Sequence, residues 1–188
     1  MVSKDNPRPG GRSARVQAAV HQAVRDMLAV IDRAEVTIPL IAQRANVTPS
    51  TIYRRWGDLQ ELLADVAASR LQPETEPAET GSVRADLQAW TEQYADEMSS
   101  GAGREMIRDI LSVPDTANAE KCSGYTQQQL RVLIARAQQR GEAFPTLTEL
   151  MDYVISPIMY RILFEQPPSN DCVRGLISRV MSEAVAKS

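Results

Sequence analysis

The sequence has little of the chemistry that metal centres, disulfide frameworks and most active sites require. It holds two cysteines and one histidine among 188 residues, and aromatic residues make up 5% of it. Cys122 and Cys172 cannot form a disulfide framework, and His21 cannot complete a zinc site with them. We therefore expect no metal and no cofactor. The sparse cysteine also favours a reducing, cytoplasmic location.

Long apolar segments are absent as well. No run approaches the roughly 20 apolar residues that a membrane-spanning helix needs, and the polar first residues do not resemble a signal peptide. The sequence therefore predicts no membrane partner. It also contains no phosphate-binding glycine loop, no nucleophile elbow and no clustered catalytic set, which argues against an enzyme.

Helix-forming residues in amphipathic order make up most of the chain. Ala, Leu, Arg, Gln and Glu dominate, and β-branched residues do not cluster in alternating runs. Apolar residues recur at spacings of three and four, which is the period of a helix with one buried face. Composition and period together predict an all-α fold.

Charge is distributed unevenly, although the net charge is only −3. Residues 1–60 hold nine basic and five acidic residues, whereas residues 61–188 hold twelve basic and nineteen acidic ones. Eight of the nine N-terminal cations are arginines, whose planar guanidinium suits phosphates and base edges. This asymmetry indicates a nucleic-acid partner for the N-terminal part.

The chain is predicted to have two parts. We expect a DNA-binding head over residues 1–57 and a helical body over residues 58–188. The segment 72–81, rich in proline and glutamate, is predicted to be a linker because apolar contacts cannot hold it in a core. Within the head, residues 1–12 form a flexible arm, and Ser13 is the expected cap of the first helix.

The stretch from Thr37 to Trp56 has the pattern of a helix-turn-helix. Thr37 and Thr48 are the expected N-caps of two short helices, each with a proline in its first turn. Gly57 is expected to end the second of these helices, and Asp58 to cap the helix that follows. Asn46 lies where the turn between the helices needs a left-handed residue. The second helix turns hydroxyls and arginines outward, and a helix of this size fits the major groove of duplex DNA.

The same residues resemble a known family. The run IAQRANVTPSTIYRRW followed by GDLQELL resembles the DNA-binding signature of the TetR family of bacterial transcriptional regulators. Asn46 stands where the family usually has Gly, Trp56 where it has Phe, and Leu59 where it commonly has a phosphate-binding Lys. The resemblance implies a three-helix head with a helix-turn-helix, followed by a C-terminal helical bundle.

The resemblance, together with the basic arm, also implies residue roles in DNA binding. Hydroxyls and helix N-termini hold phosphates, and the variable positions of the second helix read bases. Arg55 is expected to compensate for the missing Lys. Arg8 and Arg15 join the arm contacts, and the main predicted set is Arg12, Thr37, Thr48, Pro49, Ser50, Thr51, Tyr53, Arg54 and Arg55.

A ligand cavity is expected in the body, where the resemblance places a small-molecule pocket. Bulky, soft and amphipathic side chains adapt to ligands, although core packing alone also explains such a stripe. Formal charges are scarce along these apolar stripes, so we expect a neutral or weakly charged, partly aromatic or aliphatic effector. The predicted lining residues are Trp90, Tyr94, Met98, Met106, Tyr125 and Tyr153.

The last two helices are predicted to form a homodimer interface. Apolar residues occupy two positions in nearly every turn, more than one neighbouring helix can bury. Pro157 lies inside the first of these helices and is expected to kink it or to be accommodated by local rearrangement. The predicted interface residues are Ile155, Met159, Ile162, Leu176, Ile177 and Val180.

These features predict a ligand-responsive transcriptional regulator that binds a double-stranded operator as a homodimer. Repression, relieved by a small hydrophobic effector, is the sense that the resemblance implies. Two alternatives stay open at this point. The body could bind a protein partner and no small ligand, or the chain could be a small all-α enzyme.

Overall fold

The structure, a computed structural model, describes residues 11–186. Every regular element in this range is a helix, as the sequence predicted. The chain divides into two compact units, one ending at Val66 and the other beginning at Ala67. The division falls inside a helix, later than the expected boundary after residue 57 and earlier than the segment 72–81.

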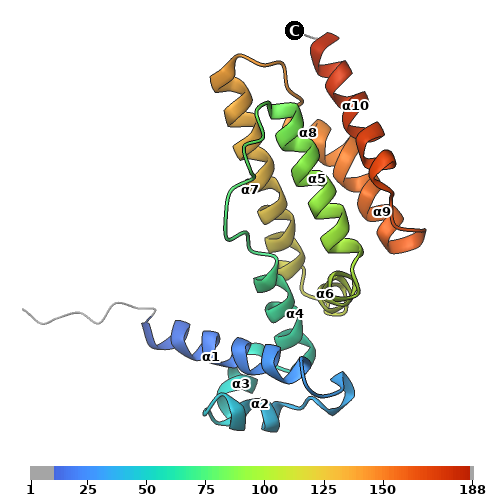
Figure 1. The fold of residues 1–188 in the computed structure, drawn as a ribbon. Helices are drawn as coiled ribbons and strands as arrows, with labels where there is room; N and C mark the ends of the chain where they lie inside the picture. The colour runs from blue at the N-terminus through green and yellow to red at the C-terminus, as the bar shows by residue number, and fades with distance from the viewer. Residues whose placement is uncertain (1–10, 187–188) are drawn as a thin grey trace, which may run out of the picture. The chain divides into compact units, whose positions relative to one another are not determined.

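The first unit contains the helix-turn-helix. Its apolar core gathers residues from every α-helix of the unit, among them Val20, Ile41, Ile52 and Leu62. Figure 1 shows these helices in blue to green. They are α1 (Gly11–Leu28), a short 3₁₀ turn (Arg33–Glu35), α2 (Ile38–Arg44), α3 (Pro49–Trp56) and α4 (Leu59–Arg70), which continues past Val66.

Local signals in the head act as the sequence predicted, with two exceptions. Asn46 has a φ of 52°, and Gly57, which ends α3, has a φ of 82°. Asp58 caps α4, accepting a hydrogen bond from the Glu61 N–H at 2.9 Å. The first exception is that α1 is already helical at Gly11, so Ser13 is not its cap. The second concerns the threonines, described next.

Thr37 and Thr48 stand at the N-cap positions of α2 and α3 in extended conformation, but neither side chain makes a capping hydrogen bond. Their hydroxyls therefore accept no hydrogen bond from the backbone N–H groups of the first turns that they precede. The helix α1 begins within the expected arm, so Arg12 and Arg15 are helical residues. Arg8 lies outside the described residues.

The second unit is a helical bundle. Figure 1 shows α5 beside α7 and α10, with α9 adjoining. One apolar core joins these helices, with Leu87, Leu133, Ile158 and Ile177 among its fully buried members. The elements are α5 (Val83–Ser99), α6 (Gly101–Leu111), α7 (Ala117–Arg140), α8 (Leu147–Leu150), a π-helical turn η2 (Met151–Ile155), α9 (Ser156–Phe164) and α10 (Asn170–Ala186).

Pro157 is accommodated by rearrangement of the helix before it. It has no N–H to donate to the preceding turn, and the five residues Met151–Ile155 form a wider π-helical turn. Ser156 Oγ donates to the Met151 carbonyl at 2.8 Å, which satisfies one backbone acceptor of this turn. α8, η2 and α9 therefore follow one another without a break.

The predicted interface residues of the last helices need correction. Ile155, Ile162, Ile177 and Val180 are at most 4% exposed and belong to the core of their own chain. The wide stripes are covered within one chain because α10 packs on both α5 and η2. Met159 and Leu176 are half-buried against the same core, and the apolar side chains left exposed on α9 are Tyr160, Leu163 and Phe164.

Two expected absences can be compared with the described residues. Between residues 11 and 186, no helix is long and apolar enough to cross a membrane. The same residues contain no cluster of three or more metal-ligating side chains.

Candidate nucleic-acid interface and ligand cavity

The turn between α2 and α3 sets how the second helix projects. The Val47 N–H donates to the Ala42 carbonyl at 2.9 Å, closing a tight connection through Asn46. Ile52 is completely buried and Trp56 is 8% exposed, so both fix the inner face of α3. The outer face of α3 is left without cover within the first unit.

That outer face carries most of the predicted DNA-binding residues. Pro49, Ser50, Tyr53 and Arg54 are exposed, and Thr51 is half-buried. The hydroxyl of Thr48 lies 2.9 Å from those of both Ser50 and Thr51, forming a polar cluster at the N-terminus of α3. Backbone N–H groups and hydroxyls at such a position can contact phosphate, and the side chains beyond it can reach base edges.

Thr37 and Arg12 are exposed outside α3, the first before α2 and the second in the first turn of α1. Arg55 is engaged within the head. Its guanidinium donates to Ser13 Oγ at 2.6 Å and to Gln17 Oε1 at 2.5 Å, both on α1. The structure thus holds Arg55 against α1, where the sequence suggested a phosphate contact.

The second unit contains a cavity of about 750 Å³ that is open to solvent on one side. It lies among α5, α6, α7, η2 and α9, with the segment 72–78 as a further wall. Trp90 and Tyr94 stack one turn apart on α5, with ring centroids 5.4 Å apart and an interplanar angle of 19°. A cavity of this size and lining suits a small organic molecule.

Four of the six predicted lining residues reach this cavity: Trp90, Tyr94, Met98 and Tyr125. Met106 and Tyr153 do not line it, and Tyr153 is 54% exposed. Both belong to helices that border the cavity, but they lie on other faces of them. The sequence indicated correctly that these two helices border the cavity, but it could not predict which side chains of α6 and η2 line it.

The interior of the cavity is uncharged. Burial raises the pKa of the Tyr94 hydroxyl to about 12, against a weaker lowering effect of the hydrogen bond with Thr126. Burial likewise raises the pKa of the Cys122 thiol to about 11. Both groups are therefore neutral at physiological pH. The charged lining residues are all exposed at the edge: Arg70, Glu74, Glu76 and Glu97.

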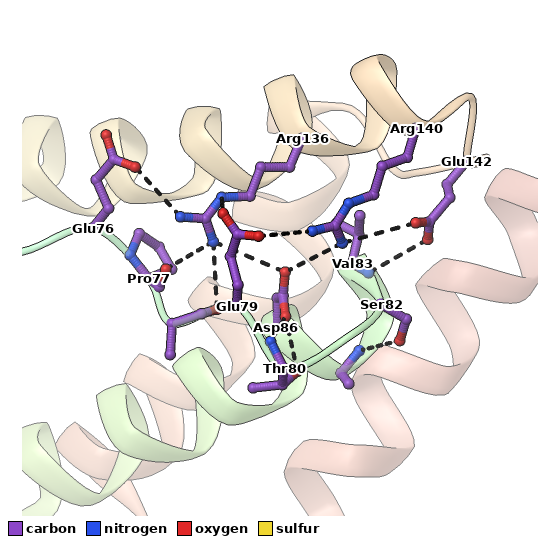
Figure 2. A network of polar contacts seen from close by, with 12 residues as sticks. Glu76, Pro77, Glu79, Thr80, Ser82, Val83, Asp86, Arg136, Arg140 and Glu142 are labelled. Atoms are coloured by element: carbon purple, nitrogen blue, oxygen red, sulfur yellow. Dashed lines mark hydrogen bonds and ion pairs between the residues drawn. The ribbon is translucent and has the colours of Figure 1, made fainter.

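The segment 72–80, called the strap below, lies within the expected linker of residues 72–81. It runs along α7 as one wall of the cavity and is held there by hydrogen bonds to its backbone and by ion pairs of Glu76 and Glu79 with Arg136 and Arg140 (Figure 2). Arg136 Nη1 donates to the Pro77 carbonyl at 2.7 Å, and Gln129 Nε2 donates to the Thr75 carbonyl at 3.2 Å. Polar side chains of α7 therefore anchor both the backbone carbonyls and the glutamate side chains of the strap.

The end of the strap is fixed by a buried carboxylate. Asp86 Oδ1 accepts hydrogen bonds from the Thr80 N–H at 2.6 Å and from the Thr80 hydroxyl at 2.8 Å. Its other oxygen lies 3.7 Å from Arg140 and 3.9 Å from Arg136 (Figure 2). Burial opposes the charge, but the Thr80 bonds and the two arginines outweigh it and lower the pKa of Asp86.

Models of known protein families match residues in both units of the chain. A family model described as "Bacterial regulatory proteins, tetR family" matches residues 28–66. A second, described as "Tetracyclin repressor-like, C-terminal domain", matches residues 77–180. The first match covers the helix-turn-helix, and the second covers more than half of the chain.

Individual relatives agree with these matches. YdeS of Bacillus subtilis, an HTH-type transcriptional regulator, is 26% identical over 186 residues, or 94% of this chain and 93% of that protein. An HTH-type transcriptional regulator of Mycobacterium tuberculosis is 23% identical over 159 residues, or 81% of this chain and 79% of that protein. AqdR of Rhodococcus erythropolis, another HTH-type regulator, is 28% identical over 106 residues, 54% of this chain and 51% of that protein.

Solved structures show the same fold. The TetR family transcription regulator SCO0332 superposes with a TM-score of 0.68 at 20% identity, covering 89% of this chain and 97% of that one. A TetR-family regulator from Mesorhizobium loti gives a TM-score of 0.60 at 16% identity, covering 94% of this chain and 98% of that one.

Proposed function

Because the chain belongs to the TetR family of bacterial transcriptional regulators, we propose that it is a repressor whose affinity for its operator falls when a small apolar molecule fills the cavity. DNA binding and transcriptional regulation are properties of the family. The response to a ligand, the repressor role and the contact residues go beyond the family assignment, and they are what we propose here.

The observation that carries the DNA-binding half is the uncovered outer face of α3. Tyr53 and Arg54 project from a helix whose inner face is fully packed, next to an N-terminal hydroxyl cluster. In this proposal Thr37, Thr48 and Thr51 contact phosphates, and Pro49, Ser50, Tyr53 and Arg54 face the major groove. Arg12 contacts phosphate from the start of α1.

The ligand-responsive half is supported by the cavity. Its neutral interior and stacked Trp90–Tyr94 pair favour an uncharged aromatic or aliphatic body, and its acidic edge disfavours phosphorylated or carboxylated molecules. Trp90, Tyr94, Met98 and Tyr125 are the proposed contacts. A body that served only to bind another protein would have no need of a largely apolar cavity of this size.

Regulation then follows from linkage. A ligand shifts the equilibrium towards the body conformation that it binds better, and operator affinity falls if that conformation disfavours the DNA-bound arrangement of two heads. We propose that the two copies pair through α9 and α10, using side chains that the single chain leaves exposed. Tyr160, Leu163 and Phe164 of α9 are those side chains.

One experiment tests both halves. Duplexes selected from a random pool by the purified protein are titrated in the presence of neutral apolar compounds, with binding followed by fluorescence anisotropy. We expect at least one compound to weaken operator binding and to quench Trp90 in a Trp56→Phe variant. Ser123→Phe, which adds a ring at the cavity wall, abolishes that response, whereas Gln128→Phe on the exposed side of α7 preserves it. Selection of a duplex with no compound effect would leave the DNA-binding half standing and refute the ligand half.

A further inference from the structure

A single carboxylate oxygen joins three helices of the head. Asp65, on α4, accepts at Oδ2 from Trp56 Nε1 at 2.9 Å and from Gln17 Nε2 at 3.1 Å. His21 Nε2 lies 3.0 Å from the same oxygen. Since an ionised carboxylate only accepts, the histidine donates from Nε2. Trp56 ends α3, and Gln17 and His21 both lie on α1.

A second link runs from Gln17 to the other side of α3. The Oε1 atom of Gln17 accepts from Arg55 Nη2 at 2.5 Å, and Arg55 also donates to Ser13. The guanidinium of Arg55 lies 5.2 Å from the centroid of the Trp56 ring, within reach of a cation–π contact. Two consecutive residues at the C-terminal end of α3 are thus tied, directly or through Gln17, to Asp65.

The carboxylate of Asp65 affects both stability and orientation. Its side chain is 16% exposed and borders an apolar core that contains Trp56 and Leu62. An apolar side chain at this position would leave the N–H donors of Trp56, Gln17 and His21 without their shared acceptor, so Asp65 stabilises the head. The carboxylate also gives direction, because hydrogen bonds with defined geometry fix the orientation of the groups that donate them.

We infer that Asp65 is a positioning residue for DNA recognition, setting the orientation of α3 through Trp56 and through the Gln17–Arg55 link. This inference rests on the proposed binding of DNA by the outer face of α3. It assigns Arg55 the role of a brace between α3 and α1. Tyr53 and Arg54, which directly precede the two braced residues, are the side chains whose placement depends on it.

The decisive property is the sign of the effect of removing the charge. Asp65→Asn deletes a negative charge from the DNA-binding unit, and charge alone would strengthen binding to every duplex. Positioning predicts the opposite for the selected operator. Asparagine keeps one neutral carbonyl oxygen for the three donors, but it brings an NH2 donor and loses the charge-assisted part of their bonds, which is enough for about a tenfold loss of operator affinity, with affinity for a scrambled duplex unchanged or higher. Glu61→Gln, on the same helix, is the matched control and retains the wild-type ratio of the two affinities.

A second variant and a spectroscopic signal separate positioning from folding. Gln17→Met keeps the side-chain volume and removes both hydrogen bonds of a half-buried residue, so it folds and loses several-fold in operator affinity. In a Trp90→Phe background, Trp56 emission reports on its environment, and Asp65→Asn shifts it in the absence of DNA.

The outcomes are distinct. The inference is overturned if Asp65→Asn and Gln17→Met keep the wild-type ratio of operator affinity to scrambled-duplex affinity. It is also overturned if both affinities fall equally and the fall follows a reduced fraction of folded protein. Failure of the wild-type protein to select any duplex refutes the proposed function instead.

Discussion

Arg140 Nη1 lies 3.7 Å from Oδ2 of Asp86, a carboxylate with no exposed surface. The pKa of Asp86 is lowered, so its ionised form stabilises the fold above the pKa that it has in the unfolded chain, and this stabilisation is lost as pH falls through the folded-state pKa. Acid should therefore destabilise the protein partly through this residue, below about pH 4. Asp86→Asn should lower the melting temperature at pH 7 and flatten its decline between neutral and acidic pH. A variant whose acid decline is as steep as that of the wild type would contradict this role.

Arg136 is predicted to hold the strap in place. Its side chain is 12% exposed and bonds the Pro77 carbonyl, so Arg136→Met leaves a buried acceptor without its partner. Loss of one partner from such a buried polar group costs about 2–4 kcal/mol of stability. Endoproteinase Glu-C should cut the strap faster after Glu74 and Glu79, whereas the bond between Glu76 and Pro77 resists this protease. Arg131→Met, an exposed site on the same helix, is the control, and equal cleavage rates in the two variants would refute the anchoring role.

The proposed dimer interface is tested through side chains exposed on the single chain. Tyr160 is 57% exposed and Phe164 is 73% exposed, with ring centroids 5.2 Å apart. Replacing both by Glu should produce a folded monomer with undiminished helix content, because neither ring belongs to the core. Sedimentation velocity measures the result. Leu111→Glu, at an exposed site on α6, should stay dimeric, and a dimeric double variant would place the interface elsewhere.

The head could be predicted closely because its signals are local. A left-handed Asn46, a proline in the first turn of α3 and a glycine after Trp56 each act on one turn of backbone. The sequence predicted the N-cap positions of Thr37 and Thr48 correctly but not the bonding of their hydroxyls, because a threonine before a helix can direct its hydroxyl either to the backbone or to neighbouring side chains. Here the hydroxyl of Thr48 meets those of Ser50 and Thr51.

The body shows what periodicity cannot supply. The stripe through Ile155 and Ile162 correctly indicated burial, but a pattern of buried positions does not say whether the covering surface comes from the same chain or from another. The strap has no apolar pattern, and its partners Gln129 and Arg136 lie more than fifty residues further along the chain. Asp65 left a fainter signal, as a lone aspartate within the apolar middle of α4.

The most direct test of the central claim, that α3 reads operator DNA, is an anisotropy titration of a selected duplex with Tyr53→Ala and Arg54→Ala. Each truncation should cost about 1–3 kcal/mol of operator affinity if the side chain contacts DNA, with little change in melting temperature because both residues are exposed. Arg179→Ala, an exposed arginine on α10, should bind like the wild type. Operator affinities of both α3 variants equal to that of the wild type would contradict the account.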